Sequence, residues 1–246
     1  MTEGDGILRR KSTPRRAAAS LLVAAIVSLA TFAAAIGGPA LAATPVQMIY
    51  QVTHSRYGNI GTYVNTVQPT NGGTTVQTRA HFEVKMLGLK LYSENADRIE
   101  RWQGNRLISF HSVTSKGDAS TVVKGEARGN SFVITSPTGT ITAPATVHPA
   151  NPWSSNFLNS SAMMRPDTGR VERVHVSGGE EATVTIDGAP VRAQKYDVDG
   201  DSRYTVWLNG QGVPVMFIAD DDGGKVTFTL AHCNGCGLDG SQLGMR

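Results

Sequence analysis

Apolar and polar residues alternate along most of the chain after residue 43, in short runs separated by Gly, Asp and Asn. In the final run, Val226, Phe228 and Leu230 face one side of the expected strand. Thr227 and Thr229 face the other side. Such runs predict successive antiparallel hairpins with one buried face. We therefore expect the stretch 191–230 to form the hairpins that close the sheet.

The stretch 76–86 alternates most strictly. Its apolar or small residues fall on one face: Val76, Thr78, Ala80, Phe82, Val84 and Met86. Its polar residues fall on the other: Gln77, Arg79, His81, Glu83 and Lys85. A period of two over this length predicts a long, half-buried strand. Leu87-Gly88-Leu89 breaks the alternation, and we interpret it as a bend.

Two shorter runs, 48–54 and 60–67, precede this strand. Gly58 and Gly61 suit a hairpin with a bulge, or a point where another backbone passes closely. Further hairpins are expected over the following stretch, up to residue 142. A helix over 91–102 is an alternative, but the turn and apolar run that follow favour another hairpin.

A Pro-rich segment at 148–153 interrupts the β pattern. Residues 154–164 follow it and form the one helix that we expect after residue 42. Asn151 can cap this helix and Pro152 suits its first position, and Arg165-Pro166 ends it. The pattern as a whole predicts an all-β antiparallel fold with one short helix inserted before the C-terminal hairpins.

Residues 1–42 have the features of an export signal. Basic residues come first, an apolar run over 17–36 follows, and Pro39-Ala40-Leu41-Ala42 supplies a cleavage pattern. We expect cleavage after Ala42, an uncleaved membrane anchor being the alternative. The arginine pairs lack the residues that follow them in a twin-arginine signal. The predicted organisation is a signal peptide (1–42), a single β domain (43–230) and a flexible tail (231–246), in a periplasmic or secreted protein.

The export signal changes the charge balance. The whole chain has a formal net charge of +3, but five basic and two acidic residues lie in 1–42, so the rest carries 18 of each sign. These charges are dispersed, and no basic patch is left for a phosphate backbone. Binding of nucleic acid is therefore excluded as a main role.

The two cysteines, Cys233 and Cys236, form a C-x-x-C pair. In an exported protein such a pair is a small-loop disulfide or a redox dithiol. Glycines surround it and no helical pattern follows, which disfavours a redox enzyme. With His232 it offers three metal ligands, whereas a closed zinc site needs four. We expect a disulfide or unpaired thiols without a catalytic role, with metal and redox functions as alternatives.

Other motifs for catalysis or metal binding are weak. The acidic turns at 197–201 and 220–224 are typical of solvated hairpin turns, and the first lacks the Glu that ends a calcium loop. The histidines are scattered singly. There is no Gly-x-Ser-x-Gly elbow and no Gly-rich phosphate loop. We predict no catalytic residue, metal site or cofactor.

Aromatic residues are spread over the predicted strands and helix, and ordinary core packing explains them most simply. In the sharper interpretation, the helix that carries Trp153 lies across the concave face and gates an apolar cavity. The candidate ligand-binding residues in that interpretation are Trp153, Phe157, Tyr196, Trp207 and Phe110.

The order of motifs is similar to that of a known group of proteins. The motifs are a Tyr50-x-Val52 strand followed by Ile60-Gly61, the Trp153 segment, Val184-x-Ile186-Asp187-Gly188, Ala193-x-x-Tyr196, Gly200-Asp201-x-x-Tyr204-x-Val206-Trp207-Leu208 and Gly223-Gly224-x-Val226-x-Phe228-x-Leu230. Over residues 47–230 the chain resembles exported bacterial families described only as domains of unknown function.

That resemblance implies an envelope location and a strongly bent, half-barrel-like antiparallel meander. It implies no activity or cofactor. Similar half-barrels occur in periplasmic lipoprotein carriers, which is an analogy of fold alone. We expect a non-catalytic envelope protein that binds an apolar ligand, such as a lipid, or an envelope protein on the concave face. A hydrolase with an active site outside known motifs, and a structural or assembly protein, are the alternatives.

Overall fold

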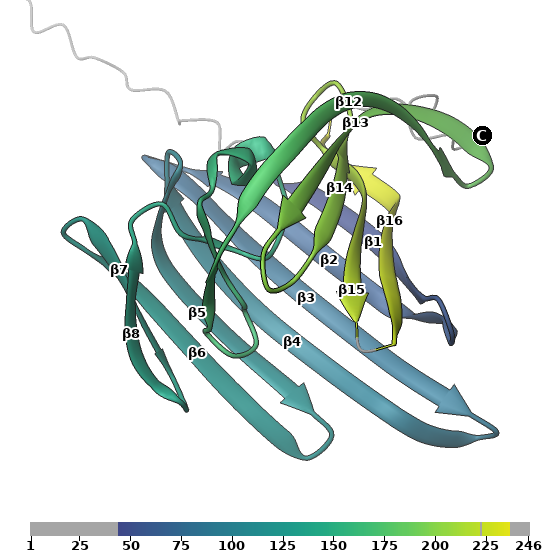
Figure 1. Cartoon of the computed structure of the whole chain (residues 1–246), viewed down its shortest axis with the longest axis horizontal. Helices are drawn as coiled ribbons and strands as arrows, with labels where there is room; N and C mark the ends of the chain where they lie inside the picture. Colours follow the sequence, from purple (N-terminus) through teal and green to yellow (C-terminus); the bar gives the residue numbers. More distant parts are fainter. Residues whose placement is uncertain (1–43, 222, 237–246) are drawn as a thin grey trace, which may run out of the picture. The chain divides into compact units, whose positions relative to one another are not determined.

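The computed structural model describes residues 44–221 and 223–236. Thirteen antiparallel strands of this part form one sheet in the order β12-β13-β14-β15-β16-β1-β2-β3-β4-β5-β6-β7-β8 (Figure 1). Its strands are β1 (Val46–His54), β2 (Gly58–Thr70), β3 (Gly73–Met86), β4 (Leu89–Gln103), β5 (Arg106–Lys116), β6 (Ala119–Arg128), β7 (Ser131–Ser136), β8 (Gly139–Pro144), β12 (His175–Ile186), β13 (Ala189–Asp199), β14 (Tyr204–Leu208), β15 (Pro214–Asp221) and β16 (Gly224–Asn234). The all-β prediction is confirmed.

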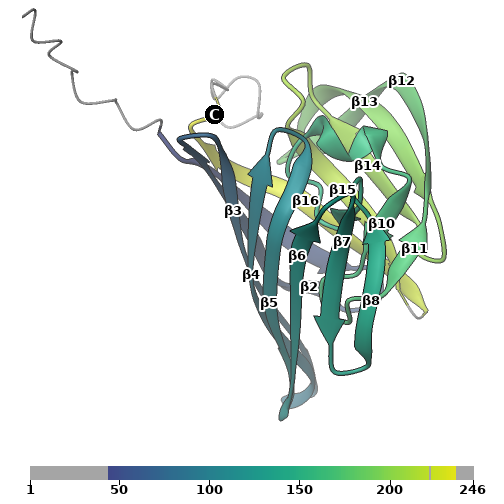
Figure 2. The ribbon, with the colours of Figure 1, turned by 90° about the vertical axis from the view of Figure 1, so that its left-hand side faces the viewer.

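The sheet bends strongly but does not close. Among the described residues, β12 and β8 are its two edges and do not pair. The bend turns β12–β16 toward the face of β3–β8, as Figure 2 shows. The C-terminal hairpins therefore join the two halves of the sheet through pairing of β16 with β1, rather than closing a barrel.

Apolar residues fill the concave side in two clusters. The larger cluster joins β1–β4 to β12–β16, and the rings of Tyr63 and Phe217 meet edge to face there at 6.0 Å. The smaller cluster lies over β3–β8 and includes Phe110 and Phe132. The predicted face of β3 is confirmed from Val76 to Val84, whereas Met86 is exposed.

The segment 145–174, called here the crossing segment, links β8 to β12 across the concave side. It contains a small sheet of β9 (His148–Pro149), β10 (Ala162–Met164) and β11 (Val171–Arg173), in the order β11-β10-β9. It also contains the 3-10 turn η1 (Ser155–Asn159). Phe157 and Met163 pack into the larger cluster and Met164 into the smaller one, so the segment belongs to both cores.

The expected helix over 154–164 is wrong in its length and its cap. The helical part is only η1, and Ser154 caps it by accepting a hydrogen bond from the Asn156 amide at 3.3 Å. Residues 162–164 are a strand because they pair with β9 on one side and β11 on the other. Tertiary pairing overrides the local helical preference here.

A glycine bulge within β2 and a tight turn between β3 and β4 both depend on positive φ angles. Gly61 is confirmed as a bulge and a close approach, since it has φ +144° and a Cβ there would lie 1.9 Å from the His81 carbonyl oxygen. Leu87 and Gly88 both have positive φ, as the tight turn of a two-residue hairpin requires. The expected bend at residues 87–89 is therefore the turn between β3 and β4.

The predicted boundary at residue 230 is too early. β16 continues to Asn234, and Cys233 pairs with Met48 of β1. The strand extends because β1 begins at Val46 and offers backbone partners for these residues. The predicted signal peptide (1–42) and the rest of the predicted tail (237–246) lie outside the described residues.

Candidate functional site

A buried amide holds the crossing segment onto the sheet. Asn151 Nδ2 donates to Glu100 Oε1 at 2.8 Å and to Thr78 Oγ1 at 3.1 Å. Its Oδ1 accepts from the Tyr63 hydroxyl at 2.7 Å and from Asn65 Nδ2 at 3.0 Å. Both donors and both lone pairs of the amide are used, which is its full hydrogen-bonding capacity. The segment is thus fixed at one place on β2, β3 and β4.

Glu100 is the buried carboxylate of this network. Its Oε2 accepts hydrogen bonds from the indoles of Trp102, at 2.9 Å, and Trp153, at 3.2 Å. Burial raises the pKa of Glu100 to about 7, although the hydrogen bonds from Asn151 and the two indoles act in the opposite direction. With all of these donors directed at it, the carboxylate has a structural role and is shielded from any ligand.

The crossing segment leaves a cavity of about 490 Å³ at one end of the concave side. Apolar walls come from β2, β3 and β16, and the loop 165–167 forms another side. The volume lies within the range of about 300–1,000 Å³ that is usual for small-molecule sites. The residues that line it are His54, Tyr57, Ile60, Phe82, Val84, Leu91, Tyr92, Glu94, Arg98, Lys116, Ala150, Arg165, Pro166, Asp167, Ser202, Tyr204, Ala219, Asp220, Asp221, Val226 and Phe228.

Ion pairs organise the polar side of this cavity. Lys116 contacts Asp167 at 3.1 Å and Glu94 at 3.5 Å, and Arg165 contacts Asp167 at 3.4 Å. The pKa of the Asp167 carboxyl lies below its ordinary value because the effects of Arg165 and Lys116 outweigh that of burial. These contacts tie the loop 165–167 to the ends of β4 and β5.

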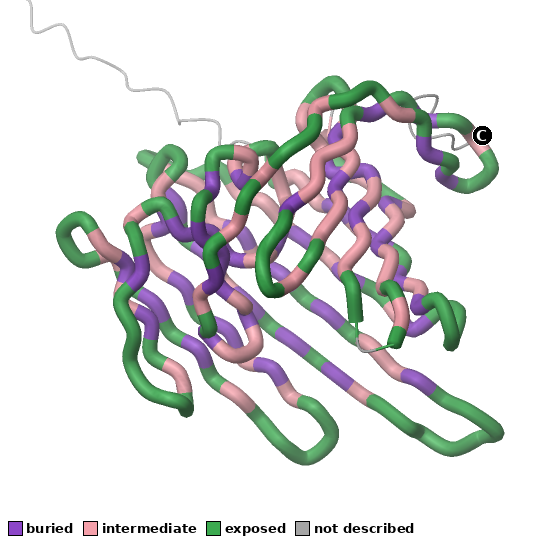
Figure 3. The backbone as a smooth tube through the Cα atoms, in the orientation of Figure 1, coloured by how far each residue is buried: buried purple, intermediate pink, exposed green. Residues whose placement is uncertain are grey.

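An apolar hairpin arm projects beside the cavity. Residues 83–93 of β3 and β4 pair only with each other, because β2 pairing ends at Phe82 and β5 pairing begins at Glu94. Leu87 is 96% exposed, and Met86, Leu89 and Leu91 are more than half exposed. The arm is the exposed tip at the lower right of Figure 3. Leu91 also lines the cavity, so the arm adjoins the cavity wall.

The five predicted ligand-binding residues do not meet in one site, and none of them lines the 490 Å³ cavity. Trp153 packs against both core clusters, Phe157 is buried in the larger cluster and Phe110 in the smaller one. Tyr196 lines a polar groove beside η1. Trp207 is partly buried on β14 and packs, like Tyr196, against the larger cluster.

Sequence reasoning missed the charged groups of the cavity. β4 carries Glu94, Arg98 and Glu100 on the same face as Trp102, and all four are buried. The signal was present as alternation, since these residues are separated by even numbers of positions. The run 97–101 is charged at every position except Ile99, however, which hides the two charges on the buried face.

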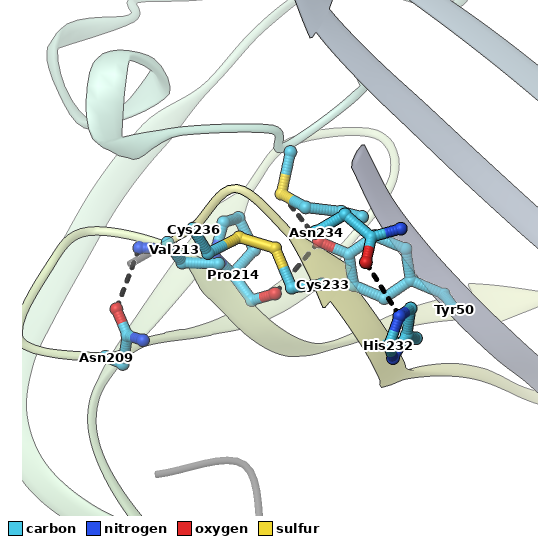
Figure 4. Close-up of a disulfide and its surroundings, with 9 residues drawn as sticks. Tyr50, Asn209, Val213, Pro214, His232, Cys233, Asn234 and Cys236 are labelled. Atoms are coloured by element: carbon cyan, nitrogen blue, oxygen red, sulfur yellow. Dashed lines mark hydrogen bonds between the residues drawn. A yellow bond between two sulfur atoms is a disulfide. The ribbon is translucent and has the colours of Figure 1, made fainter. Parts of the chain in front are cut away.

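Cys233 and Cys236 form a disulfide at the end of β16 (Figure 4). His232 Nε2 lies 2.8 Å from Asn234 Oδ1. Nearby, the Tyr50 hydroxyl donates to the Pro214 carbonyl oxygen at 2.9 Å and so links β1 to β15. The disulfide closes a short loop at the end of β16, the strand that joins the two halves of the sheet.

Side chains that could hold a metal ion do not converge in the part of the chain that the structure describes. Within 44–221 and 223–236, no three His, Cys, Asp or Glu side chains lie close enough to hold a metal ion. His54 Nε2 is 3.5 Å from Asp221 in the cavity, but its Nδ1 accepts from the Arg56 amide, so neither ring nitrogen is engaged with a hydroxyl. In the same residues, no helix is long and apolar enough to cross a membrane.

Comparison with protein families identifies the fold group. Residues 50–231 match the family described as Domain of unknown function (DUF6134). The chain belongs to this family. The sequence motifs of residues 47–230 predicted a family described only as a domain of unknown function, and the DUF6134 match confirms this prediction.

A solved structure shares this DUF6134 fold. The crystal structure of a β-barrel-like protein of domain of unknown function DUF1849 from Brucella abortus matches with a TM-score of 0.59 and 13% identity, covering 79% of this chain and 98% of that one. LprF from Mycobacterium bovis matches at a TM-score of only 0.27, with 11% identity over 78% of this chain and 85% of that one. A comparison with curated proteins found no match.

Proposed function

We propose that this protein is exported to the bacterial envelope and binds a small apolar molecule there without catalysis. The observation that carries the proposal is the 490 Å³ cavity, with Ile60, Val84 and Phe228 among its walls. The proposed ligand lies at the open end of the concave side, because the crossing segment already fills the middle of it. Trp153 and Phe157 then act as core residues beneath the site.

The hairpin arm supports the same proposal. A monomer rarely exposes a contiguous apolar patch without a function for it. Leu91 belongs to both the arm and the cavity wall, so the exposed apolar residues of the arm adjoin the cavity through this side chain. In this proposal the arm is the route by which the ligand enters.

A fluorescence titration tests ligand binding. The neutral probe N-phenyl-1-naphthylamine is expected to brighten on binding to the wild-type protein. Ala219→Phe places a ring among the cavity-lining residues and is expected to weaken this binding at least tenfold. Thr227→Phe is the matched control, because Thr227 pairs with Ile218 on the opposite face of the same hairpin. Equal binding by both variants would place the probe elsewhere.

Export is tested separately. Edman sequencing of protein from the periplasmic fraction of the expressing cells is expected to begin at Ala43, directly after the Ala42 cleavage position. A product that keeps residues 1–42 and sediments with membranes would instead support the uncleaved anchor.

Docking of an envelope protein on the arm is the second candidate function, and the exposure of Met86, Leu87 and Leu89 favours it. A triple variant, Met86→Thr, Leu87→Asn and Leu89→Thr, makes the tip polar. Asn tolerates the positive φ at position 87. If a partner docks there, crosslinking in periplasm recovers it with the wild type alone, and probe binding by the variant is retained.

A further inference from the structure

Arg98 is a buried cation beside the cavity. It lies on β4 in the row of concave-side residues that includes Glu94 and Glu100, and it is only 7% exposed. Its side chain lines the cavity. Burial raises the pKa of Tyr63 to about 12, and the adjacent Arg98 guanidinium acts in the opposite direction, which places the two groups side by side.

No carboxylate of residues 44–221 and 223–236 forms an ion pair with this guanidinium, although Glu100 on the same face interacts with it electrostatically from a greater distance. No acidic oxygen of that part lies within 4.0 Å of it, and its Nε is buried without a hydrogen-bond partner. Glu100, two residues along the same face, already accepts from Asn151, Trp102 and Trp153. A buried charge without an ion-pair partner is costly, because the neighbouring Tyr63 hydroxyl and the more distant Glu100 carboxylate replace only part of the hydration that it loses.

The other charged side chains of the cavity have partners. Lys116 and Arg165 contact Asp167, as described above. Asp220 contacts Lys225 at 3.0 Å, and Asp221 contacts His54. Among the described residues that line the cavity, Arg98 is therefore the charged group that still has room for an ion pair.

We propose that Arg98 binds the anionic head of the cavity's ligand, so that the ligand is an amphiphile with a carboxylate or phosphate head and an apolar chain. This inference rests on the proposed function. The guanidinium can donate two parallel hydrogen bonds to either head. The chain then lies against Phe82, Val84 and Phe228, which line the same cavity.

Calorimetric titration with dodecanoate, dodecyl phosphate, dodecanol and acetate tests this assignment. The titrations use both the form cleaved after Ala42 and the full-length, uncleaved chain. The wild type is expected to bind one or both anionic amphiphiles at least tenfold more tightly than dodecanol, and acetate far more weakly. Arg98→Met is expected to lose roughly 10- to 100-fold in affinity for the anions, as loss of a charge-assisted hydrogen bond implies. Its affinity for dodecanol should change less than threefold.

Two further variants separate charge from structure. Arg98→Lys keeps the cation and is expected to retain part of the preference for anions. Arg101→Met removes an exposed cation from the other face of β4 and is expected to leave every affinity unchanged. The wild-type comparison of dodecanoate with dodecanol needs no variant and decides whether the ligand has an anionic head, and Arg98→Lys then tests the residue if Arg98→Met does not fold.

The outcomes are distinguishable. Equal binding of dodecanoate and dodecanol, unaffected by Arg98→Met, would overturn the role of Arg98 but leave the proposed apolar site intact. Acetate binding as tight as that of dodecanoate would overturn the amphiphile and indicate an anion site alone. No binding of any chain would overturn the proposed function and this inference together.

Discussion

Glu100→Gln tests whether the buried carboxylate sets the pH dependence of stability. The folded-state pKa of Glu100 is about 7, against an ordinary value of 4.5, because burial disfavours its charged form. Between these two values the folded state holds a proton that the unfolded state has lost. The stabilisation is therefore fully present below pH 4.5 and is lost as the pH rises through about 7.

The magnitude follows from the size of this shift. One pKa unit corresponds to about 1.4 kcal/mol. The loss of stability is about 1 kcal/mol at pH 5 and about 3 kcal/mol at pH 8, a difference of about 2 kcal/mol. Glutamine does not titrate. Its amide NH2 group also has to face either the Asn151 donor or the two indole donors, which adds a constant cost that does not depend on pH.

Urea unfolding at pH 5, 6, 7 and 8 measures the difference in unfolding free energy between wild type and Glu100→Gln. That difference is expected to shrink by about 2 kcal/mol from pH 5 to pH 8, because only the wild type weakens through this group. Glu126→Gln, at an exposed position on β6, serves as the control and should give a constant difference. A constant difference for Glu100→Gln as well would refute the reasoning and mean that the three donors keep the carboxylate charged at pH 5.

Three further changes test other parts of the fold. Asn151→Ala leaves Tyr63, Asn65 and Glu100 each without one hydrogen-bond partner, so we expect the free energy of unfolding in urea to fall by about 3–5 kcal/mol. The control Asn130→Ala, in an exposed turn, should cost less than about 0.5 kcal/mol. Similar losses for the two variants would mean that the network contributes little to stability. Gly61→Ala puts a Cβ 1.9 Å from the His81 carbonyl oxygen and should lower the free energy of unfolding by at least about 3 kcal/mol. Gly117→Ala has open space around its Cβ and should lower it by about 1 kcal/mol. A loss of about 1 kcal/mol for Gly61→Ala as well would show that β3 can move away. Replacing Cys233 and Cys236 by Ser opens a four-residue loop and should lower the free energy of unfolding by about 2 kcal/mol through chain entropy. Reduction of the wild-type disulfide should have the same effect. A loss above about 4 kcal/mol would mean that the disulfide also holds β16 on β1.

The sequence by itself determined the β architecture. Alternation over residues 76–84 places one face of β3 in the core, because successive side chains of a strand point to opposite sides. The turn chemistry at Gly58 and Gly61 also placed a hairpin and a close approach correctly, since positive φ and the lack of a Cβ are local properties of glycine. The family of unknown function could be inferred from the same strand-and-turn motifs.

Only the tertiary structure decided where the concave side is filled and where it is open. Local preference favoured a helix through residue 164, but pairing with β9 and β11 makes 162–164 a strand. The aromatic residues chosen as ligand contacts pack in or against the two core clusters, and Tyr196 also lines a groove, so they do not line the cavity. Periodicity gives the face on which a side chain lies, but it does not give the distant segment that covers that face. For the same reason the sequence could not show that Asn151 donates a hydrogen bond to Glu100. Nor could it show that Arg98 lines the cavity without an ion-pair partner among the described residues.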